Sequence, residues 1–189
     1  AVAGDLRPST DRIMEAVMRG IEALGHVPVN CGKIPSPAVA FYGFKRRIPA
    51  IMVTGSHIPA DRNGIKFNKC SGEGLKSDEA GICRQVVTLV DDEFDSAGAF
   101  TRPSGLAGRP ISGVPVEEYA ARYREYFGVD SLKGRRLGVY QHSAVGRDVL
   151  GRILRALGAA VSPMGRSATV VRVDTGGVQP GVVDSRCGR

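Results

Sequence analysis

The sequence predicts an α/β fold, in which a layered first domain with a mixed, mostly parallel sheet is followed by the beginning of a second, similar α/β domain. Strand-length and helix-length patterns alternate along the chain, which is typical of α/β layers. Residues 50–54 form an almost continuous apolar run, as expected for a parallel strand covered on both faces. Because residues 128–134 have the composition of a linker, we expect domains at 1–129 and 130–189.

The first helix is predicted to begin with Thr10 as its N-cap and to stop at Gly25. A short strand is expected immediately afterwards, at residues 27–29. Apolar residues at helical spacing should bury one face of this helix: Ile13, Val17, Ile21 and Leu24.

Periodicity and capping signals place the remaining elements, and residues 91–113 should form an irregular connection between two of them. Ser36 and Ser77 are the expected N-caps of the second and third helices. The expected helices lie at 37–44, 78–89, 115–127 and 146–157, and the expected strands at 65–67, 136–141 and 159–164.

Composition indicates a soluble globular protein, because hydrophobic residues make up 42% and charged residues 24% of the 189 residues. No apolar run approaches the roughly 18 residues of a membrane span, and the N-terminus lacks a signal-peptide pattern. We therefore expect a cytoplasmic protein without a membrane partner. The four cysteines form no C-x-x-C pair and are expected to be free thiols. The formal net charge is +7, but the densest basic cluster, residues 45–47, is too short to favour a nucleic-acid partner.

The polar loop at residues 55–63 carries the candidate chemistry. Ser56 follows the carboxyl end of the apolar strand, which is where open α/β sheets bind ligands. The turn at Asn63 and Gly64 should return the chain so that Lys66 approaches Ser56. A hydroxyl, the imidazole of His57 and an ammonium would then converge, a combination suited to phosphoryl transfer. From these residues alone, an ordinary polar loop remains an alternative, whereas a serine hydrolase would need a G-x-S-x-G elbow that is missing here.

Several motifs resemble the α-D-phosphohexomutase superfamily, of the bacterial phosphomannomutase and phosphoglucomutase type. The string TGSHIPADRNGIKF is similar to its active-site loop, and GDLRPST to the stretch that opens its first helix. GKIPSPAVAFYGF resembles the segment before the catalytic strand, and residues 133–167 resemble the start of the second domain. The motifs occur in the family's order and cover residues 4–175, which makes the resemblance specific to the N-terminal part of the family.

The resemblance implies a phosphosugar mutase that moves a phosphoryl group between the 1- and 6-positions of a hexose phosphate, either mannose or glucose phosphate. Ser56 would be the phosphoserine, Lys66 a proton-transfer or charge-stabilising group, and His57 its support. The implied phosphate-binding residues are Arg7, Asn63 and Gly64, although Arg7 could instead be a surface arginine before a helix.

The resemblance also implies Mg²⁺, bound through Ser56 or its phosphate and three aspartates of a D-G-D-x-D-R loop. That string is missing from this sequence, and the acidic residues 91–95 have the pattern of a solvated loop. We therefore expect an incomplete metal site and a truncated, inactive form of the enzyme. A non-catalytic phosphosugar or anion-binding module is the alternative. The sequence leaves the preferred hexose and the oligomeric state open.

Overall fold

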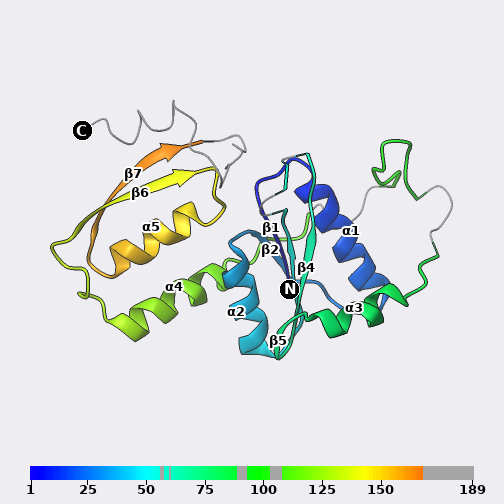
Figure 1. Cartoon of the computed structure of the whole chain (residues 1–189), viewed down its shortest axis with the longest axis horizontal. Helices are drawn as coiled ribbons and strands as arrows, with labels where there is room; N and C mark the ends of the chain where they lie inside the picture. Colours follow the sequence, from blue (N-terminus) through cyan, green and yellow to red (C-terminus); the bar gives the residue numbers. More distant parts are fainter. Residues whose placement is uncertain (56–57, 60, 89–92, 103–107, 168–189) are drawn as a thin grey trace.

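The computed structural model describes residues 1–55, 58–59, 61–88, 93–102 and 108–167. A five-stranded sheet and a two-stranded sheet lie in separate halves of the molecule (Figure 1). Two helices bridge the halves, α2 (Ser36–Arg46) and α4 (Val114–Phe127), which pack against each other. No helix among these described residues is long and apolar enough to span a membrane.

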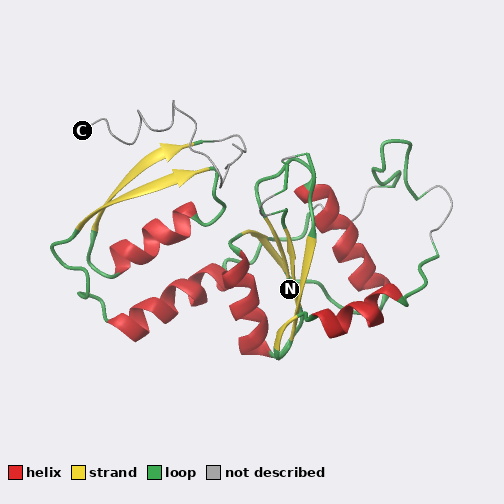
Figure 2. Cartoon of the chain, viewed as in Figure 1, coloured by secondary structure: helices red, strands yellow, loops and turns green. Residues whose placement is uncertain are grey.

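The larger sheet is mixed, as predicted, with the strand order β2-β1-β3-β4-β5. Its first three strands run parallel and the last two are antiparallel additions (Figure 2). The strands are β1 (Val2–Gly4), β2 (Asn30–Lys33), β3 (Ala50–Val53), β4 (Ile65–Lys69) and β5 (Gly72–Glu73). Strand β1 was not predicted, because three residues are too few to show a pattern.

Strand β3 is buried on both faces, which confirms the interpretation of its apolar run. Successive side chains of a strand point to opposite faces. Met52 joins a core cluster with Val39 of α2, whereas Val53 joins a second cluster with Met14 of α1 (Thr10–Ala23). The two helices therefore cover opposite faces of the parallel part of the sheet.

The strand predicted at residues 27–29 is wrong. Val27 is exposed, and β2 begins at Asn30. The inward positions of β2 are filled by Cys31 and by Gly32, whose φ of 66° and contact with Ile111 leave no room for a side chain. The strand therefore lacks the branched aliphatic residues by which strands are recognised.

The first helix differs from its prediction at both ends. Ser9 occupies the N-cap position, and Thr10 lies inside the helix with a buried side chain. Leu24 is exposed because the helix ends before it, at Ala23, and Gly25 then adopts a φ of 77° as the predicted stop. Met14 and Met18 supply the fully buried contacts, with Ile13, Val17 and Ile21 packed partly buried around them.

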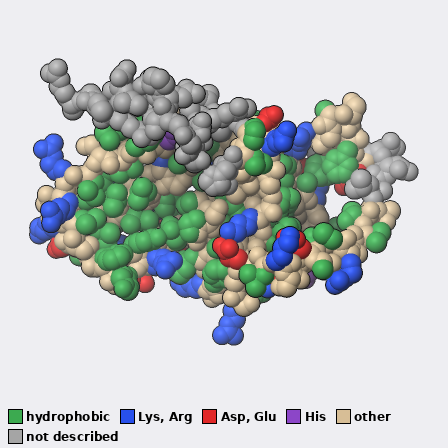
Figure 3. Space-filling view, in the orientation of Figure 1, with side chains coloured by type: hydrophobic (Ala, Val, Ile, Leu, Met, Phe, Trp, Pro, Cys, Tyr) green, Lys and Arg blue, Asp and Glu red, His purple; other side chains and the backbone are tan. Residues whose placement is uncertain are grey.

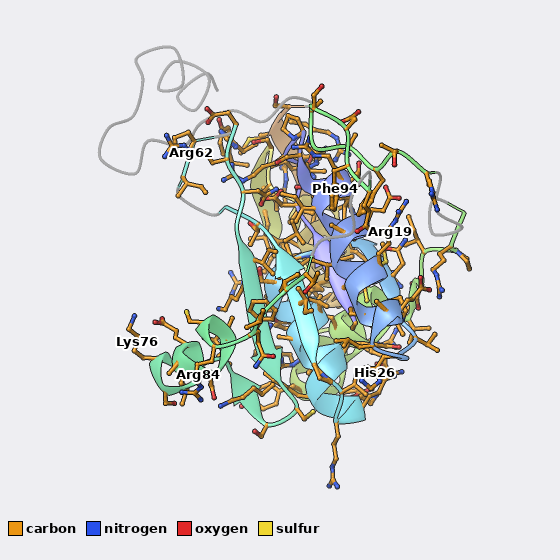
Figure 4. The ribbon with its side chains drawn as sticks, turned by 90° about the vertical axis from the view of Figure 1, so that its right-hand side faces the viewer. Arg19, His26, Arg62, Lys76, Arg84 and Phe94 are labelled. Carbon is orange, nitrogen blue, oxygen red and sulfur yellow. The ribbon has the colours of Figure 1, made fainter. Side chains whose placement is uncertain are left out.

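The third helix, α3 (Lys76–Cys83), is shorter than predicted and begins earlier. Leu75, not Ser77, is its N-cap, because the Asp78 carboxylate accepts the Leu75 backbone N–H at 2.7 Å. None of its residues is buried, and Figure 4 shows Lys76 projecting into solvent. Because no face of α3 is buried, its sequence carries no clear apolar stripe, and both predicted ends of the helix were therefore inaccurate.

The smaller sheet consists of two parallel strands, β6 (Arg136–His142) and β7 (Ala160–Arg166), connected by α5 (Arg147–Ala156). These elements lie within two residues of their predicted positions. A cavity of about 650 Å³ opens between β6, α5 and α4, and apolar side chains gather on this face (Figure 3). One continuous core cluster extends from α2 through α4 to α5, so the two halves share apolar packing.

Candidate functional site

The loop from Thr54 to Gly64 connects β3 to β4 at the carboxyl ends of the parallel strands. The backbone N–H of Thr54 donates to the Gly64 carbonyl at 2.9 Å, which brings the two ends of the loop together. Figure 4 shows Arg62 on the outer part of the loop. Ser56 and His57 lie outside the described residues, so their predicted positions and roles stay predictions.

Asp5 anchors the loop through hydrogen bonds of its carboxylate. It directly follows β1, and Thr54 directly follows the neighbouring β3. Its Oδ2 accepts the Thr54 hydroxyl at 2.8 Å, and its Oδ1 accepts the Thr10 hydroxyl at 2.8 Å. Asp5 also accepts the backbone N–H of Arg7 at 3.0 Å and its Nε at 3.1 Å. One carboxylate therefore joins the ends of two parallel strands and the start of α1.

The environment of Asp5 favours its ionised form. Burial alone raises the pKa of a carboxyl group, and here it is the largest single contribution. The hydrogen bonds from the Arg7 amide and from the Thr10 and Thr54 hydroxyls, together with the Arg7 charge, outweigh burial. The pKa of Asp5 consequently lies below its ordinary value of 3.8.

Arg7 is buried rather than on the surface, with 7% of its side chain exposed. Its two terminal nitrogens donate to the carbonyls of Ile58 and Pro59, each at 3.2 Å. The guanidinium also packs against Gly55, where an added Cβ would lie 2.7 Å from Nε. The structure thus shows Arg7 holding the loop. Contact with a phosphate, as predicted from the sequence, is untested.

Asn63 and Gly64 hold the returning limb of the loop. The Asn63 amide donates to the Thr10 hydroxyl at 2.9 Å and to the Ser9 hydroxyl at 3.3 Å. Its carbonyl oxygen accepts the Gly64 N–H at 3.0 Å. A Cβ on Gly64 would lie 3.1 Å from the Thr54 carbonyl, so the position favours glycine. The chain returns to β3 here as predicted, but Asn63 and Gly64 do not themselves form a turn, and phosphate binding by these two residues stays a prediction.

Lys66 lies on β4, opposite Met52 in the register. Its Nζ pairs with the Glu73 carboxylate of β5 at 2.8 Å, and both side chains are largely exposed. Exposed pairs of this kind contribute about 0–1 kcal/mol. The ammonium is therefore held weakly and can be redirected at little cost. Its predicted approach to Ser56 involves a residue outside the described part of the chain.

Four further residues hold the loop and were not predicted as site residues: Asp5, Ser9, Thr10 and Thr54. The only sequence signal for Asp5 and Thr54 is their position, because each directly follows a strand. Recognising it would have required β1, whose three residues carry no pattern. The hydrogen bond between these two side chains joins positions 49 residues apart, which local spacing cannot reveal.

Among the described residues there is no cluster of three or more His, Cys, Asp or Glu side chains that could hold a metal ion. Asp95, in the acidic segment, instead accepts the backbone N–H groups of Ala97 and Ala99 at 2.9 and 2.8 Å. Its carboxylate stabilises its own loop.

Comparisons with known proteins agree on one family. Residues 1–91 match the model of phosphoglucomutase/phosphomannomutase, alpha/beta/alpha domain I. A phosphomannomutase of Sinorhizobium fredii is 41% identical over 174 residues, covering 92% of this chain and 36% of that protein. A phosphomannomutase of Salmonella muenchen is 39% identical over 175 residues, covering 93% and 34%.

More distant relatives include a phosphoglucosamine mutase of Clostridium perfringens, 29% identical over 85% of this chain and 35% of that protein. The crystal structure of a Burkholderia thailandensis protein, described as a member of the phosphoglucomutase/phosphomannomutase family, has the same fold. It superposes with a TM-score of 0.63 at 23% identity, covering 90% of this chain and 36% of that one. The chain spans about a third of the length of the relatives it matches.

Proposed function

Since the chain belongs to the phosphoglucomutase/phosphomannomutase superfamily, we propose that it carries the phosphoserine domain of a phosphosugar mutase. The observation that supports this best is the loop at residues 54–64, tied through Asp5 to the edge of the sheet where α/β folds bind ligands. We assign the phosphoserine domain to residues 1–129 and the start of a second domain to residues 130–189.

In the proposed reaction, phosphorylated Ser56 transfers its phosphoryl group to a free hydroxyl of a hexose phosphate, either mannose or glucose phosphate. The bond between Oγ and phosphorus breaks, and a bisphosphorylated sugar forms. After the sugar reorients, the Ser56 hydroxyl takes the phosphoryl group from the other position, which regenerates phosphoserine and releases the isomer. A covalent intermediate of this kind divides one transfer into two.

Lys66 is proposed to stabilise the negative charge on the transferring group or to move a proton, with His57 in support. Phosphoryl transfer depends mainly on positioning and charge stabilisation. The weak pair with Glu73 would have to open for this role, which the exposure of both partners makes inexpensive. Because the substrate is an ionised sugar phosphate, which does not cross membranes unaided, we expect the reaction to take place in the cytoplasm.

Ser56 is also proposed to reach Mg²⁺ through its phosphate, as the superfamily's reaction implies. The residues present do not complete such a site, because the sequence has no D-G-D-x-D-R string and the described residues contain no metal-binding cluster. No step of the transfer is therefore assigned to the ion. For the same reason, we expect the isolated 189-residue chain to show no measurable turnover of mannose 1-phosphate, and clear turnover that depends on Ser56 would contradict this.

The test uses a graft, in which residues 1–167 replace the matching segment of the Sinorhizobium fredii phosphomannomutase. We expect the graft to convert mannose 1-phosphate in a coupled assay, and Ser56→Ala to abolish this activity. Ser71→Ala, at an exposed turn between β4 and β5, is the matched control and should retain it. Activity that survives Ser56→Ala would refute the proposal. Calorimetric binding of hexose phosphate without turnover would favour the non-catalytic module.

A further inference from the structure

We propose that Asp5 and Arg7 are positioning residues that set the conformation of the Ser56 loop. The structural part of this inference stands on contacts between described residues, whereas its consequence for catalysis depends on the proposed function of Ser56. Neither side chain is proposed to touch the reacting phosphoryl group.

Arg7 contacts the loop on both sides of Ser56 and His57. On the side that precedes them, its guanidinium packs on Gly55, so closely that a methyl group there would overlap it. On the side that follows, it donates to the Ile58 and Pro59 carbonyls. The Ile58 N–H in turn donates to the Gly55 carbonyl at 3.0 Å. One planar group therefore fixes the two backbone positions that flank the candidate nucleophile.

Asp5 in turn orients Arg7. It accepts both the backbone N–H and the Nε of Arg7, which leaves the terminal nitrogens directed at the loop carbonyls. Pairing with a carboxylate also compensates for burying a guanidinium. A lysine could not reproduce this arrangement, because its single ammonium lacks the planar fork that reaches several acceptors at once.

The arrangement matters because phosphoryl transfer gains most of its rate from alignment of the reacting groups. A displacement of about 1 Å in a positioned group can reduce the rate roughly 100-fold. A loop held only by its two ends would allow such displacements. The Asp5–Arg7 pair restricts the loop in its middle, next to the position that carries the nucleophile.

The experiment is hydrogen exchange on the 189-residue chain, with Arg7→Met and Arg7→Lys as variants. The reporting amides are those of Ile58 and Arg62, which donate to the carbonyls of Gly55 and Pro59. The reference amide is that of Ile51, which donates to the Ala1 carbonyl within the sheet. We expect Arg7→Met to accelerate exchange at the reporting amides at least about 10-fold more than at the reference, since each of the two lost charge-assisted hydrogen bonds is worth about that factor.

The matched control is Arg147→Met. Arg147 is also largely buried and donates to the carbonyls of His142 and Ser167, but it lies in the other half of the molecule. This variant should leave exchange at Ile58 and Arg62 unchanged. Unchanged exchange at these amides in Arg7→Met, or an equal acceleration at Ile51, would overturn the proposal. If Arg7→Met does not fold, the same exchange measurement on Arg7→Lys tests the proposal, because lysine keeps the positive charge but lacks the planar guanidinium.

The catalytic consequence is tested in the graft. Arg7→Met should lower kcat at least 10-fold with little change in KM, and Arg7→Lys should restore only part of kcat. If Arg7→Met only reduces the amount of folded graft and leaves kcat per folded molecule unchanged, the role of Arg7 is purely structural and the inference is overturned. An inactive unmodified graft would count against the proposed function of Ser56, while the exchange measurements would still decide the positioning role.

Discussion

The two halves of the molecule use their apolar residues differently. In the larger sheet, α1 and α2 cover opposite faces of the parallel strands, whose apolar side chains are largely buried, whereas Ile65 and Phe67 of the antiparallel strand β4 are half-exposed. In the smaller sheet, α5 and two strands leave an apolar cavity of about 650 Å³ open towards α4. The comparison shows that an apolar pattern predicts where a strand or helix forms, but not how completely the described residues cover its apolar side.

The largest expected difference between the halves comes from deleting one apolar side chain in each. Met52 is 1% exposed in the core of the larger sheet, whereas Leu150 lines the cavity and is 47% exposed. Met52→Ala should lower the free energy of unfolding by about 2–5 kcal/mol, as for other buried Met-to-Ala changes. Leu150→Ala should cost less than about 1 kcal/mol. Urea denaturation measures both, and equal losses would remove the distinction between the halves.

A smaller effect is expected where the loop is packed against Arg7. Gly55→Ala would place a methyl group 2.6 Å from Ile58 Cγ1 and 2.7 Å from Arg7 Nε, which should cost about 1–3 kcal/mol of overpacking. Gly72→Ala, on the open edge strand β5, meets no atom within 4 Å and should change stability by less than about 0.5 kcal/mol. Thermal denaturation of the two variants compares them directly. A neutral Gly55→Ala would mean that the guanidinium does not rest on the loop.

Acid should affect the two halves through different carboxylates. The pKa of Asp5 is lowered by its hydrogen bonds and Arg7 despite burial, and the pKa of Asp148 is lowered mainly by the hydrogen bond from Arg166. A carboxylate with a lowered pKa stabilises the fold above its unfolded value and loses this contribution as the pH falls through its folded value. Both contributions should therefore disappear as the pH falls below about 4.

The variants Asp5→Asn and Asp148→Asn separate the two contributions. Asp5→Asn should flatten the loss of stability as the pH falls below about 4, because its carboxylate is largely buried. Asp148→Asn should have a smaller effect that vanishes in high salt, since this carboxylate is largely exposed. Denaturation midpoints followed against pH provide the measurement. An unaltered acid profile in Asp5→Asn would contradict the electrostatic account of the loop.

Glu73→Gln should have the smallest effect. The Lys66–Glu73 pair is exposed, so its loss should change the free energy of unfolding by less than about 0.5 kcal/mol. In the graft, releasing Lys66 should leave kcat equal or slightly higher, because the ammonium no longer has to leave the carboxylate. A large fall in stability or in kcat would show that Glu73 holds Lys66 in a required position.

Much of the fold could be predicted because its elements carry local signals. The apolar run at 50–54 indicated β3, and the α4 and α5 patterns gave boundaries within two residues. Strand β2 was not predicted, because its buried residues are Cys31 and Gly32 and its sequence shows no alternation of apolar and polar residues. Periodicity cannot detect an element whose burial comes from small residues.

The candidate site was predictable only in part. The sequence identified the loop and the return of the chain at Asn63 and Gly64, and the structure brings the two ends of the loop together there, although these two residues do not form the predicted turn. It did not reveal Asp5, whose partner Thr54 is distant in sequence, nor that Arg7 is buried against the loop. Such contacts depend on which strands are neighbours, which no local pattern specifies. The roles of Ser56, His57 and Lys66 stay predictions.

The most direct test of the central claim is to locate the transferred phosphate. The graft would be incubated with mannose 1,6-bisphosphate carrying a radioactive phosphate, quenched in acid and digested, and the labelled peptide sequenced. The proposed function predicts the label on Ser56 and no labelled peptide from Ser56→Ala. Label on another residue, or undiminished label in that variant, would contradict it.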